Sequence, residues 1–196
     1  CKLCSKGKWN NDIGSTDINS CKNCPSGTYS NIRGQKSQNE CRVCVAGKYS
    51  NAMFGSTLCI DCPDGFISLE KSYECDQCEL GKFANKRLEC LNCLQGKYSD
   101  DINILLETDC KLCPKGKWND ELGSTQINNC KDCSEGKYGN KFGQRLESEC
   151  TDCVAGKYSD KMFASTTCLD CPGGFISLEK SYECDQCELG KFANKR

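Results

Sequence analysis

The arrangement of the cysteines constrains this chain more than any other feature, because all 22 of them belong to Cys-x-x-Cys pairs. Successive pairs begin 15 to 20 residues apart, so the chain is divided into eleven small modules, each opening with one pair. The pairs begin at Cys1, Cys21, Cys41, Cys59, Cys75, Cys90, Cys110, Cys130, Cys150, Cys168 and Cys184.

Composition indicates what these cysteines must do. Cysteine makes up about 11% of the 196 residues, which is typical of a disulfide scaffold. Leucine, isoleucine, valine and phenylalanine together make up about 17%, below the roughly 20% that supports an ordinary core. We therefore expect small disulfide-rich β modules in a linear, elongated repeat rod, with no helix bundle and no single globular core.

Each module opens with Cys-x-x-Cys-x-x-Gly, usually followed by lysine and an aromatic residue, as in Gly47-Lys48-Tyr49. The residues after the glycine favour a short strand, and a turn and a few extended residues should lead to the next pair. No stretch keeps helical periodicity. The apolar run at residues 102–106 is expected to form a local strand or a contact between modules, with a helical turn as the alternative.

A longer period lies above the modules. Residues 1–87 align without gaps on residues 110–196 with 62 identities, and residues 65–87 are identical to residues 174–196. We therefore divide the chain into a super-repeat copy of six modules at 1–109 and a truncated copy of five at 110–196. The sequence begins on a cysteine and ends within a module, which favours a window on a longer repeating chain.

Four chemistries use Cys-x-x-Cys. Covalent haem attachment needs a following histidine, and the chain has no histidine. A zinc ribbon is compatible with much of the spacing and stays an alternative, while thioredoxin-like redox chemistry normally uses a single pair. Structural disulfides formed in an oxidising compartment fit eleven tandem pairs best, so we predict no metal and no cofactor.

The simplest repeating rule joins the second cysteine of each pair to the first cysteine of the next, and leaves Cys1 and Cys187 to partners outside this stretch. A staggered scheme, first to first and second to second, is the alternative, although the modules do not alternate. Each loop closed by the simple rule would contribute about 3 kcal/mol. That rule pairs Cys4–Cys21, Cys24–Cys41, Cys44–Cys59, Cys62–Cys75, Cys78–Cys90, Cys93–Cys110, Cys113–Cys130, Cys133–Cys150, Cys153–Cys168 and Cys171–Cys184.

The residues around the cysteines also have predicted roles. The glycine should have a positive φ angle or pass close to a disulfide, and the aromatic side chain should cover the disulfide as a miniature core. An exposed aromatic ladder that binds glycans is the alternative. The lysines beside the aromatic residues should pair with acidic residues that precede the cysteines, such as Glu40, Glu74 and Asp109, rather than form a row that binds an anionic polysaccharide.

The remaining features exclude several classes of function. The net charge of −1, with acidic and basic residues interspersed, gives no reason to expect nucleic acid as a partner. No apolar run approaches the length of a membrane span, so we expect no membrane contact within this segment. Without a histidine or a distinctive set of carboxylates, the chain is not expected to be an enzyme.

The string Cys-x-x-Cys-x-Ala-Gly-Lys-Tyr-Ser, at residues 41–50 and 150–159, closely resembles the ephrin-receptor-like repeat, and all eleven pairs share in the resemblance. It is similar in style to the cysteine-rich modules of tumour necrosis factor receptors. The resemblance implies short β modules, extracellular or cell-surface placement and the second-to-next-first pairing. Long arrays of this kind look most like surface proteins of algae, ciliates and other protists.

We therefore predict an extracellular structural protein, a component of a fibre, a flagellar hair (mastigoneme) or a cell coat. Its partners would be copies of itself, other matrix or filament proteins, or glycans. A stalk or ligand-binding ectodomain of a cell-surface receptor or adhesin is the alternative, and a metal-storage protein is a third.

Overall fold

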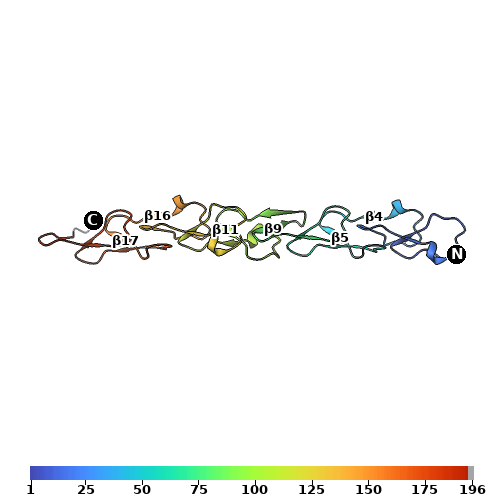
Figure 1. Cartoon of the computed structure of the whole chain (residues 1–196), viewed down its shortest axis with the longest axis horizontal. Coiled ribbons are helices and arrows are strands. Elements are labelled where there is room, and N and C mark those ends of the chain that lie inside the picture. Colours follow the sequence, from blue (N-terminus) through green and yellow to red (C-terminus); the bar gives the residue numbers. More distant parts are fainter. Residues whose placement is uncertain (194–196) are drawn as a thin grey trace. The chain divides into compact units, whose positions relative to one another are not determined.

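A computed structural model describes residues 1–193 (Figure 1). Within that range the structure has no α-helix, and its secondary structure consists of short strands and five turns of 3-10 helix. Two compact units contain the chain: residues 1–91 with 101–109, and residues 92–100 with 110–196. The prediction of small disulfide-rich β modules, without a helix bundle or a single globular core, is confirmed.

One group of strands follows the module glycines, as the lysine–aromatic pattern predicts. The two Gly-Phe-Ile modules form the same strand, so a bulky apolar pair replaces Lys-aromatic without loss of the element. The odd-numbered strands are β1 Lys8–Trp9, β3 Thr28–Tyr29, β5 Lys48–Ser50, β7 Phe66–Ile67, β9 Lys82–Asn85, β11 Lys97–Tyr98, β13 Lys117–Trp118, β15 Lys137–Tyr138, β17 Lys157–Ser159 and β19 Phe175–Ile176.

The second group of strands lies within the Cys-x-x-Cys pairs themselves or extends just beyond them. These even-numbered strands are β2 Lys22–Asn23, β4 Arg42–Val43, β6 Cys59–Asp61, β8 Asp76–Gln77, β10 Glu89–Asn92, β12 Lys111–Leu112, β14 Lys131–Asp132, β16 Thr151–Asp152, β18 Cys168–Asp170 and β20 Asp185–Gln186.

Ten two-stranded sheets join these strands in residues 1–193. Each sheet pairs the odd strand of one module with the even strand of the next, as in β13 with β14, where Lys117 lies opposite Asp132 and Trp118 opposite Lys131. No sheet has more than two strands, and two strands are marginal alone. The stability of each hairpin must therefore come from its disulfide and its neighbours.

Five modules approach the next cysteine through a 3-10 turn rather than through extended chain: η1 Ile18–Ser20, η2 Gln38–Glu40, η3 Glu107–Asp109, η4 Ile127–Asn129 and η5 Glu147–Glu149. Polar side chains hold the chain at these turns. The Glu40 carboxylate accepts the amide of Lys36 at 3.0 Å, and the Asp109 carboxylate accepts the amide of Leu106 at 3.1 Å. The acidic residue before the cysteine thus accepts a hydrogen bond from a backbone amide, a role that the sequence analysis did not predict.

In much of the chain a buried second cysteine forms the centre of a module, and Cys133 shows the pattern. Its side chain is fully buried and bonded to Cys150. Its amide donates to the carbonyl of Gly116, in the preceding module, at 2.8 Å. Its own carbonyl accepts the amide of Ala164, in the following module, at 3.2 Å. One residue therefore connects three successive modules.

The glycine after each pair has the predicted positive φ angle, but its close neighbour is not a disulfide. At Gly116, with φ of +80°, an added Cβ would lie 2.2 Å from the carbonyl oxygen of Ala164, two modules along the chain. At Gly65, the corresponding distance to the carbonyl oxygen of Ile102 is 1.9 Å. A glycine is needed at such positions both for its φ angle and because another backbone occupies the space of a side chain.

The most fully buried side chains are small. Apart from Asn119 and Ala84, the described residues with less than 2% exposure are cysteines and serines, among them Ser30, Ser50 and Ser56. Ser56 donates to the carbonyl of Ala52 at 2.7 Å and accepts the Ala52 amide at 2.8 Å, which closes a turn. The predicted aromatic core is therefore only partly correct, because disulfides and backbone approach each other too closely for larger groups.

The aromatic residues lie around this small-residue interior. Tyr98 packs on the disulfide between Cys113 and Cys130 with 8% of its surface exposed, which matches the predicted role. Phe83 is also buried, whereas Trp9 and Trp118 are half-buried. The apolar run at residues 102–106 is not a strand; it forms the predicted contact between modules, since Ile104 is buried and its carbonyl accepts the amide of Ala84 at 2.8 Å.

The close approach at Gly116 generates a prediction with a built-in control. Gly47 also has a φ of +82°, but the nearest atom to an added Cβ there would be 3.5 Å away, an ordinary van der Waals contact. Gly47→Ala should therefore cost only the left-handed backbone, about 1 kcal/mol. Gly116→Ala should cost roughly 1–3 kcal/mol more, because a backbone carbonyl must move.

Hydrogen exchange measures both effects at the amides that donate to these glycine carbonyls, that of Cys133 for Gly116 and that of Cys62 for Gly47. The Cys133 amide should lose more protection in Gly116→Ala than the Cys62 amide loses in Gly47→Ala. Equal losses at the two sites would contradict the close-approach argument.

Candidate functional site

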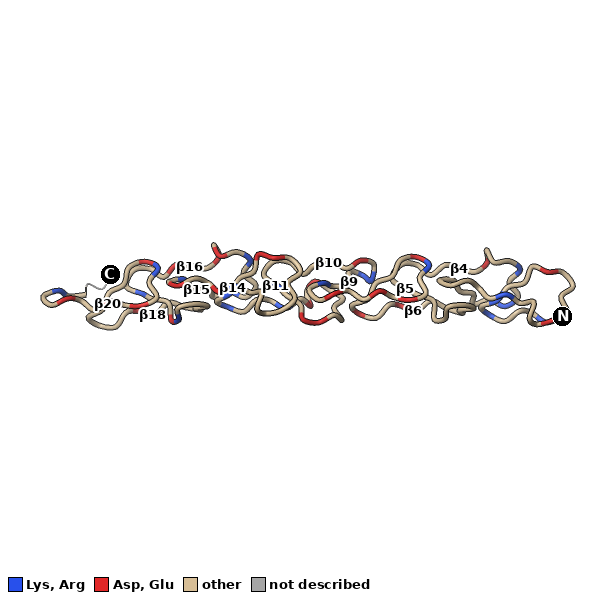
Figure 2. Tube along the Cα trace, in the orientation of Figure 1, with Lys and Arg blue, Asp and Glu red and all other residues tan. Residues whose placement is uncertain are grey.

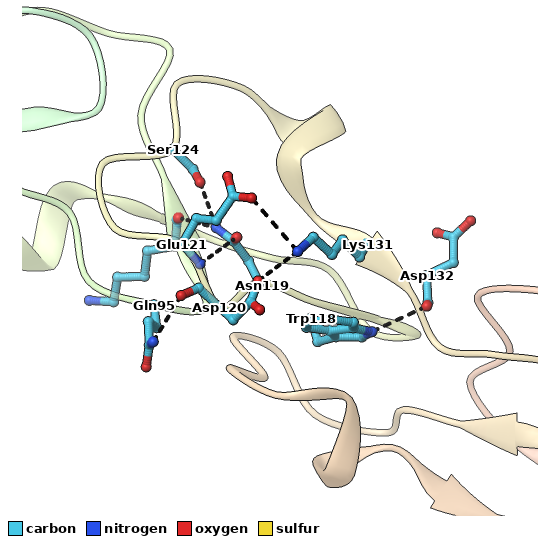
Figure 3. Close-up of polar contacts among 9 residues, drawn as sticks. Gln95, Trp118, Asn119, Asp120, Glu121, Ser124, Lys131 and Asp132 are labelled. Atoms are coloured by element: carbon cyan, nitrogen blue, oxygen red, sulfur yellow. Dashed lines mark hydrogen bonds and ion pairs between the residues drawn. The ribbon is translucent and has the colours of Figure 1, made fainter.

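The most elaborate polar cluster in the second compact unit surrounds Trp118 and Lys131, which lie opposite each other on β13 and β14 (Figure 3). The Lys131 ammonium lies 5.0 Å from the centroid of the Trp118 ring, within the range of a cation–π contact. The same ammonium lies 2.7 Å from Asp120 and 3.7 Å from Glu121. The indole N–H of Trp118 donates to the carbonyl of Asp132 at 3.2 Å.

The buried side chain of Asn119 holds the loop next to this cluster in place. Its side chain is fully buried and donates to the Lys97 carbonyl at 3.1 Å and to Ser124 Oγ at 2.8 Å. Its Oδ1 accepts the amide of Glu121 at 3.1 Å, so the amide group has partners on both sides (Figure 3). Because a buried amide with all these partners resists rotation, the loop that presents Asp120 and Glu121 is held in place.

The charges of the cluster affect one another. The hydrogen bond from Lys131 lowers the pKa of the Asp120 carboxyl below its ordinary value, and the same hydrogen bond raises the pKa of Lys131. Both side chains are 40–44% exposed, so solvent screens the interaction. The pair therefore orients Lys131 over the indole ring more than it stabilises the fold.

The first compact unit carries a weaker version of this cluster. Lys22 lies 5.0 Å from the centroid of the Trp9 ring, and its ammonium donates to Asn11 at 3.0 Å. Its closest carboxylate is that of Asp12, at 3.8 Å. Asn11 occupies the position of Asp120 in the second copy, which explains the weaker ion pairing.

Most of the lysines beside the module aromatics form ion pairs, but with partners other than the predicted acids before the cysteines. Lys48 lies 2.7 Å from Asp61, and Lys157 lies 2.9 Å from Asp170. Each of these acids lies inside the next Cys-x-x-Cys pair, directly across the hairpin from its lysine. Register decides this, because directly opposed side chains on paired strands lie closest together.

This pairing bears on the two binding alternatives raised by the sequence. In the described residues, Lys48, Lys82, Lys117, Lys137, Lys157 and Lys191 all have carboxylate partners, so they do not form a free basic row. Opposite charges alternate along each compact unit (Figure 2). The indole rings of Trp9 and Trp118 each have one ammonium on a face, where a sugar would otherwise stack.

The structure brings together all twenty cysteines of the simple pairing rule as ten disulfides within residues 1–193, with Cα–Cα distances of 5.6 to 6.0 Å. Such distances are ordinary for a disulfide. Cys1 and Cys187 have no disulfide partner among the described residues. The ten bonds are Cys4–Cys21, Cys24–Cys41, Cys44–Cys59, Cys62–Cys75, Cys78–Cys90, Cys93–Cys110, Cys113–Cys130, Cys133–Cys150, Cys153–Cys168 and Cys171–Cys184.

The surface grooves in residues 1–193 do not bring reactive side chains together. A groove of about 570 Å³ in the second compact unit is lined mainly by small and apolar residues, including Gly174, Phe175 and Ala193. Asp170 is the one titratable residue among the described residues that line it, and Asp170 is paired with Lys157. No group of three or more histidine, cysteine, aspartate or glutamate side chains in residues 1–193 is arranged to hold a metal ion.

Comparison with known families agrees with this geometry. Residues 81–130 match the family described as tyrosine-protein kinase ephrin type A/B receptor-like, and that range includes the Cys93–Cys110 and Cys113–Cys130 disulfides. This stretch of the chain, with its two disulfides, matches an ephrin-receptor-like cysteine-rich repeat. The chain matches no curated protein.

The ephrin-receptor-like repeats and the series of disulfides together indicate an extracellular structural or receptor-ectodomain role. The residues 1–193 contain no helix of the length and apolar character needed to cross a membrane. The matched segment covers about a quarter of the chain. The remaining modules also open with Cys-x-x-Cys, and two-stranded sheets of the same kind join successive modules in residues 1–193.

The sequence analysis did not predict the loop residue whose backbone amide donates to the carbonyl of the buried cysteine. In three of the 20-residue modules this residue is a glycine seven positions before the next pair: Gly34, Gly123 and Gly143. In shorter modules it stands four positions before the pair and can be Lys71 or Ala164, still with a positive φ angle. The repeated glycine was a signal, whereas a lysine or alanine at the same place gives none.

The two tryptophan clusters allow a test of the charge pairing. Asn11→Asp should give Lys22 the partner that Asp120 gives Lys131, and the pKa of the new carboxyl should fall below its ordinary value. A pH titration of the carboxyl carbons by NMR measures both acids. Because a lowered carboxyl pKa favours the charged form, each pair is intact above the ordinary pKa and is lost as the pH falls through the lowered value.

Lys131→Met is the matched control, and it should raise the pKa of the Asp120 carboxyl toward its ordinary value while leaving the pKa of the new carboxyl at position 11 unchanged. If the pKa of the Asp120 carboxyl stays lowered in this variant, Lys131 is not the cause of the lowered value.

Proposed function

We propose that the chain is part of an extracellular structural protein, a fibre, flagellar hair (mastigoneme) or cell coat built from disulfide-stapled repeats, and that it is not an enzyme. One observation carries the proposal: the same buried cysteine anchor recurs from module to module, as in Cys44, Cys113 and Cys153. A fold repeated in this way presents the same surface at intervals, which suits periodic assembly.

The surface supports assembly rather than catalysis. Large apolar side chains are exposed at matching places in the two super-repeat copies, with Met53 and Phe54 at 56% and 57%, and Met162 and Phe163 at 50% and 51%. The charged side chains of both signs are interspersed and the net charge is −1, so identical chains would not repel each other strongly. The proposed partners are copies of the chain, other matrix or filament proteins, and glycans.

A stalk or ligand-binding ectodomain of a cell-surface receptor or adhesin is the second candidate. The match of residues 81–130 to a receptor-like family favours it. In that case the same modules would act as a spacer or as a binding surface, and the proposed elongated form, which small-angle X-ray scattering measures, would serve either role.

Self-association separates the two candidates. Purified oxidised chain, followed by sedimentation over a range of concentrations and by negative-stain electron microscopy, should form ordered assemblies if it is a fibre component. Replacing Met53, Phe54, Met162 and Phe163 by serine should weaken that assembly at least tenfold without changing the disulfide pattern. A chain that stays monomeric at every concentration would favour the ectodomain instead.

The oxidised state tests the extracellular assignment itself. Native chain should leave only Cys1 and Cys187 open to alkylation after denaturation, and reduction should expose all 22 thiols. If most thiols react on denaturation alone, the extracellular structural proposal fails and the zinc alternative returns.

A further inference from the structure

The disulfides divide the chain into two kinds of segment with different mechanical positions. The loop from the second cysteine of one pair to the first cysteine of the next spans 12 to 17 residue steps, and a disulfide joins its two ends. The two Cα atoms of that bond are at most 6.0 Å apart. Each loop therefore lies in parallel with a short covalent bridge and cannot be pulled straight while the bridge is intact.

The other kind of segment, Cys-x-x-Cys, joins one bridge to the next. Its residues form the even-numbered strands, such as β2 Lys22–Asn23, β12 Lys111–Leu112 and β14 Lys131–Asp132. A strand rises about 3.3 Å per residue, close to the maximum of about 3.5 Å for a fully extended chain. These linking segments are thus extended before any force is applied.

The lengths of the two segments vary in opposite ways along the sequence. Module length changes from 15 to 20 residues, yet all eleven pairs keep two residues between their cysteines. Every change in module length therefore falls in a bridged loop, and the route through the bridges has the same number of residue steps in each module.

We propose that the chain is a tether whose covalent length is locked by its disulfides. Tension would pass along the Cys-x-x-Cys strands and across the disulfides, bypassing every loop. This inference rests on the proposed structural function for its biological use, since a fibre or coat must transmit force. The partner surfaces on the loops would then be kept out of the tensioned route.

The connectivity sets the expected lengths. From Cys4 to Cys184 the route contains ten disulfides and nine Cys-x-x-Cys segments, which together reach about 150 Å when fully extended. With all ten bonds reduced, the same stretch would reach about 630 Å. The bridged loops thus hold back about 480 Å of chain.

Single-molecule stretching with optical tweezers tests the proposal on the full chain, with peptide tags at both ends for attachment. Cys1→Ser and Cys187→Ser in this background prevent disulfide exchange by the two unpaired thiols. Without reductant, the stretch from Cys4 to Cys184 should not lengthen beyond about 150 Å. With dithiothreitol, which is oxidised as it reduces each disulfide to two thiols, the chain should lengthen in steps of about 35–55 Å.

Two double variants change the locked length by known amounts without reductant. Cys24→Ser with Cys41→Ser opens a loop of 17 residue steps and should add about 50 Å. Cys78→Ser with Cys90→Ser opens a loop of 12 and should add about 35 Å. These gains depend on the remaining covalent bonds and not on the fold of the opened loop, and peptide mapping confirms which bonds are present.

An insertion inside a loop is the matched control. Six glycines added after Gly14, an exposed residue between Cys4 and Cys21, should leave the oxidised length unchanged and add about 20 Å only after reduction. If the insertion lengthens the oxidised chain, or if the oxidised chain extends by hundreds of ångströms, tension passes through the loops and the proposal is wrong.

This outcome is separate from the test of the proposed function. A chain could be extracellular and assemble normally yet stretch through its loops, which would overturn only the tether. If the oxidised chain keeps its locked length but does not assemble, the tether proposal stands and the fibre proposal is wrong.

Discussion

The structure depends on the second cysteine of the pair, where that residue is buried and makes three connections. Its sulfur bonds to the first cysteine of the next pair, its amide donates to the glycine of the module before, and its carbonyl accepts the amide of a loop residue of the module after. This is the arrangement at Cys24, Cys44, Cys113, Cys133 and Cys153. Because one residue holds three modules, disrupting it would expose a thiol and two backbone groups together. An unsatisfied buried backbone group costs as much as a lost hydrogen bond, which keeps the arrangement cooperative.

This anchor explains why the chain manages with few buried apolar side chains. Disulfides and backbone approach so closely that mostly small residues fit between them, as at Ser56 and Gly116. Larger apolar residues are left outside, and many are exposed, including Leu69 at 71% and Leu178 at 77% in equivalent places of the two copies. The covalent staples replace part of the free energy that burial of apolar surface provides in an ordinary domain.

The two kinds of segment in a module have different roles. The residues inside Cys-x-x-Cys form strands and carry the acids that pair with lysine, such as Asp61 and Asp170. The loops carry the aromatics, the buried serines and the polar support around Asn119. A protein built this way can change its loops, as Asn11 and Asp120 show at matching positions, without altering the connections between modules.

The sequence by itself determined the module, because the spacing of cysteine pairs and the glycine that follows them leave few ways to close a chain with little apolar content. It also predicted the short strands, since lysine–aromatic pairs beside small residues favour extended chain. Only the tertiary structure decided which groups meet: the acids that face Lys48 and Lys157, the carbonyl that faces Gly65, and the small serines in place of an aromatic core. Those contacts depend on the register of the paired strands and on how closely the backbones of modules two apart approach each other. Neither can be predicted from the residue pattern of a single module.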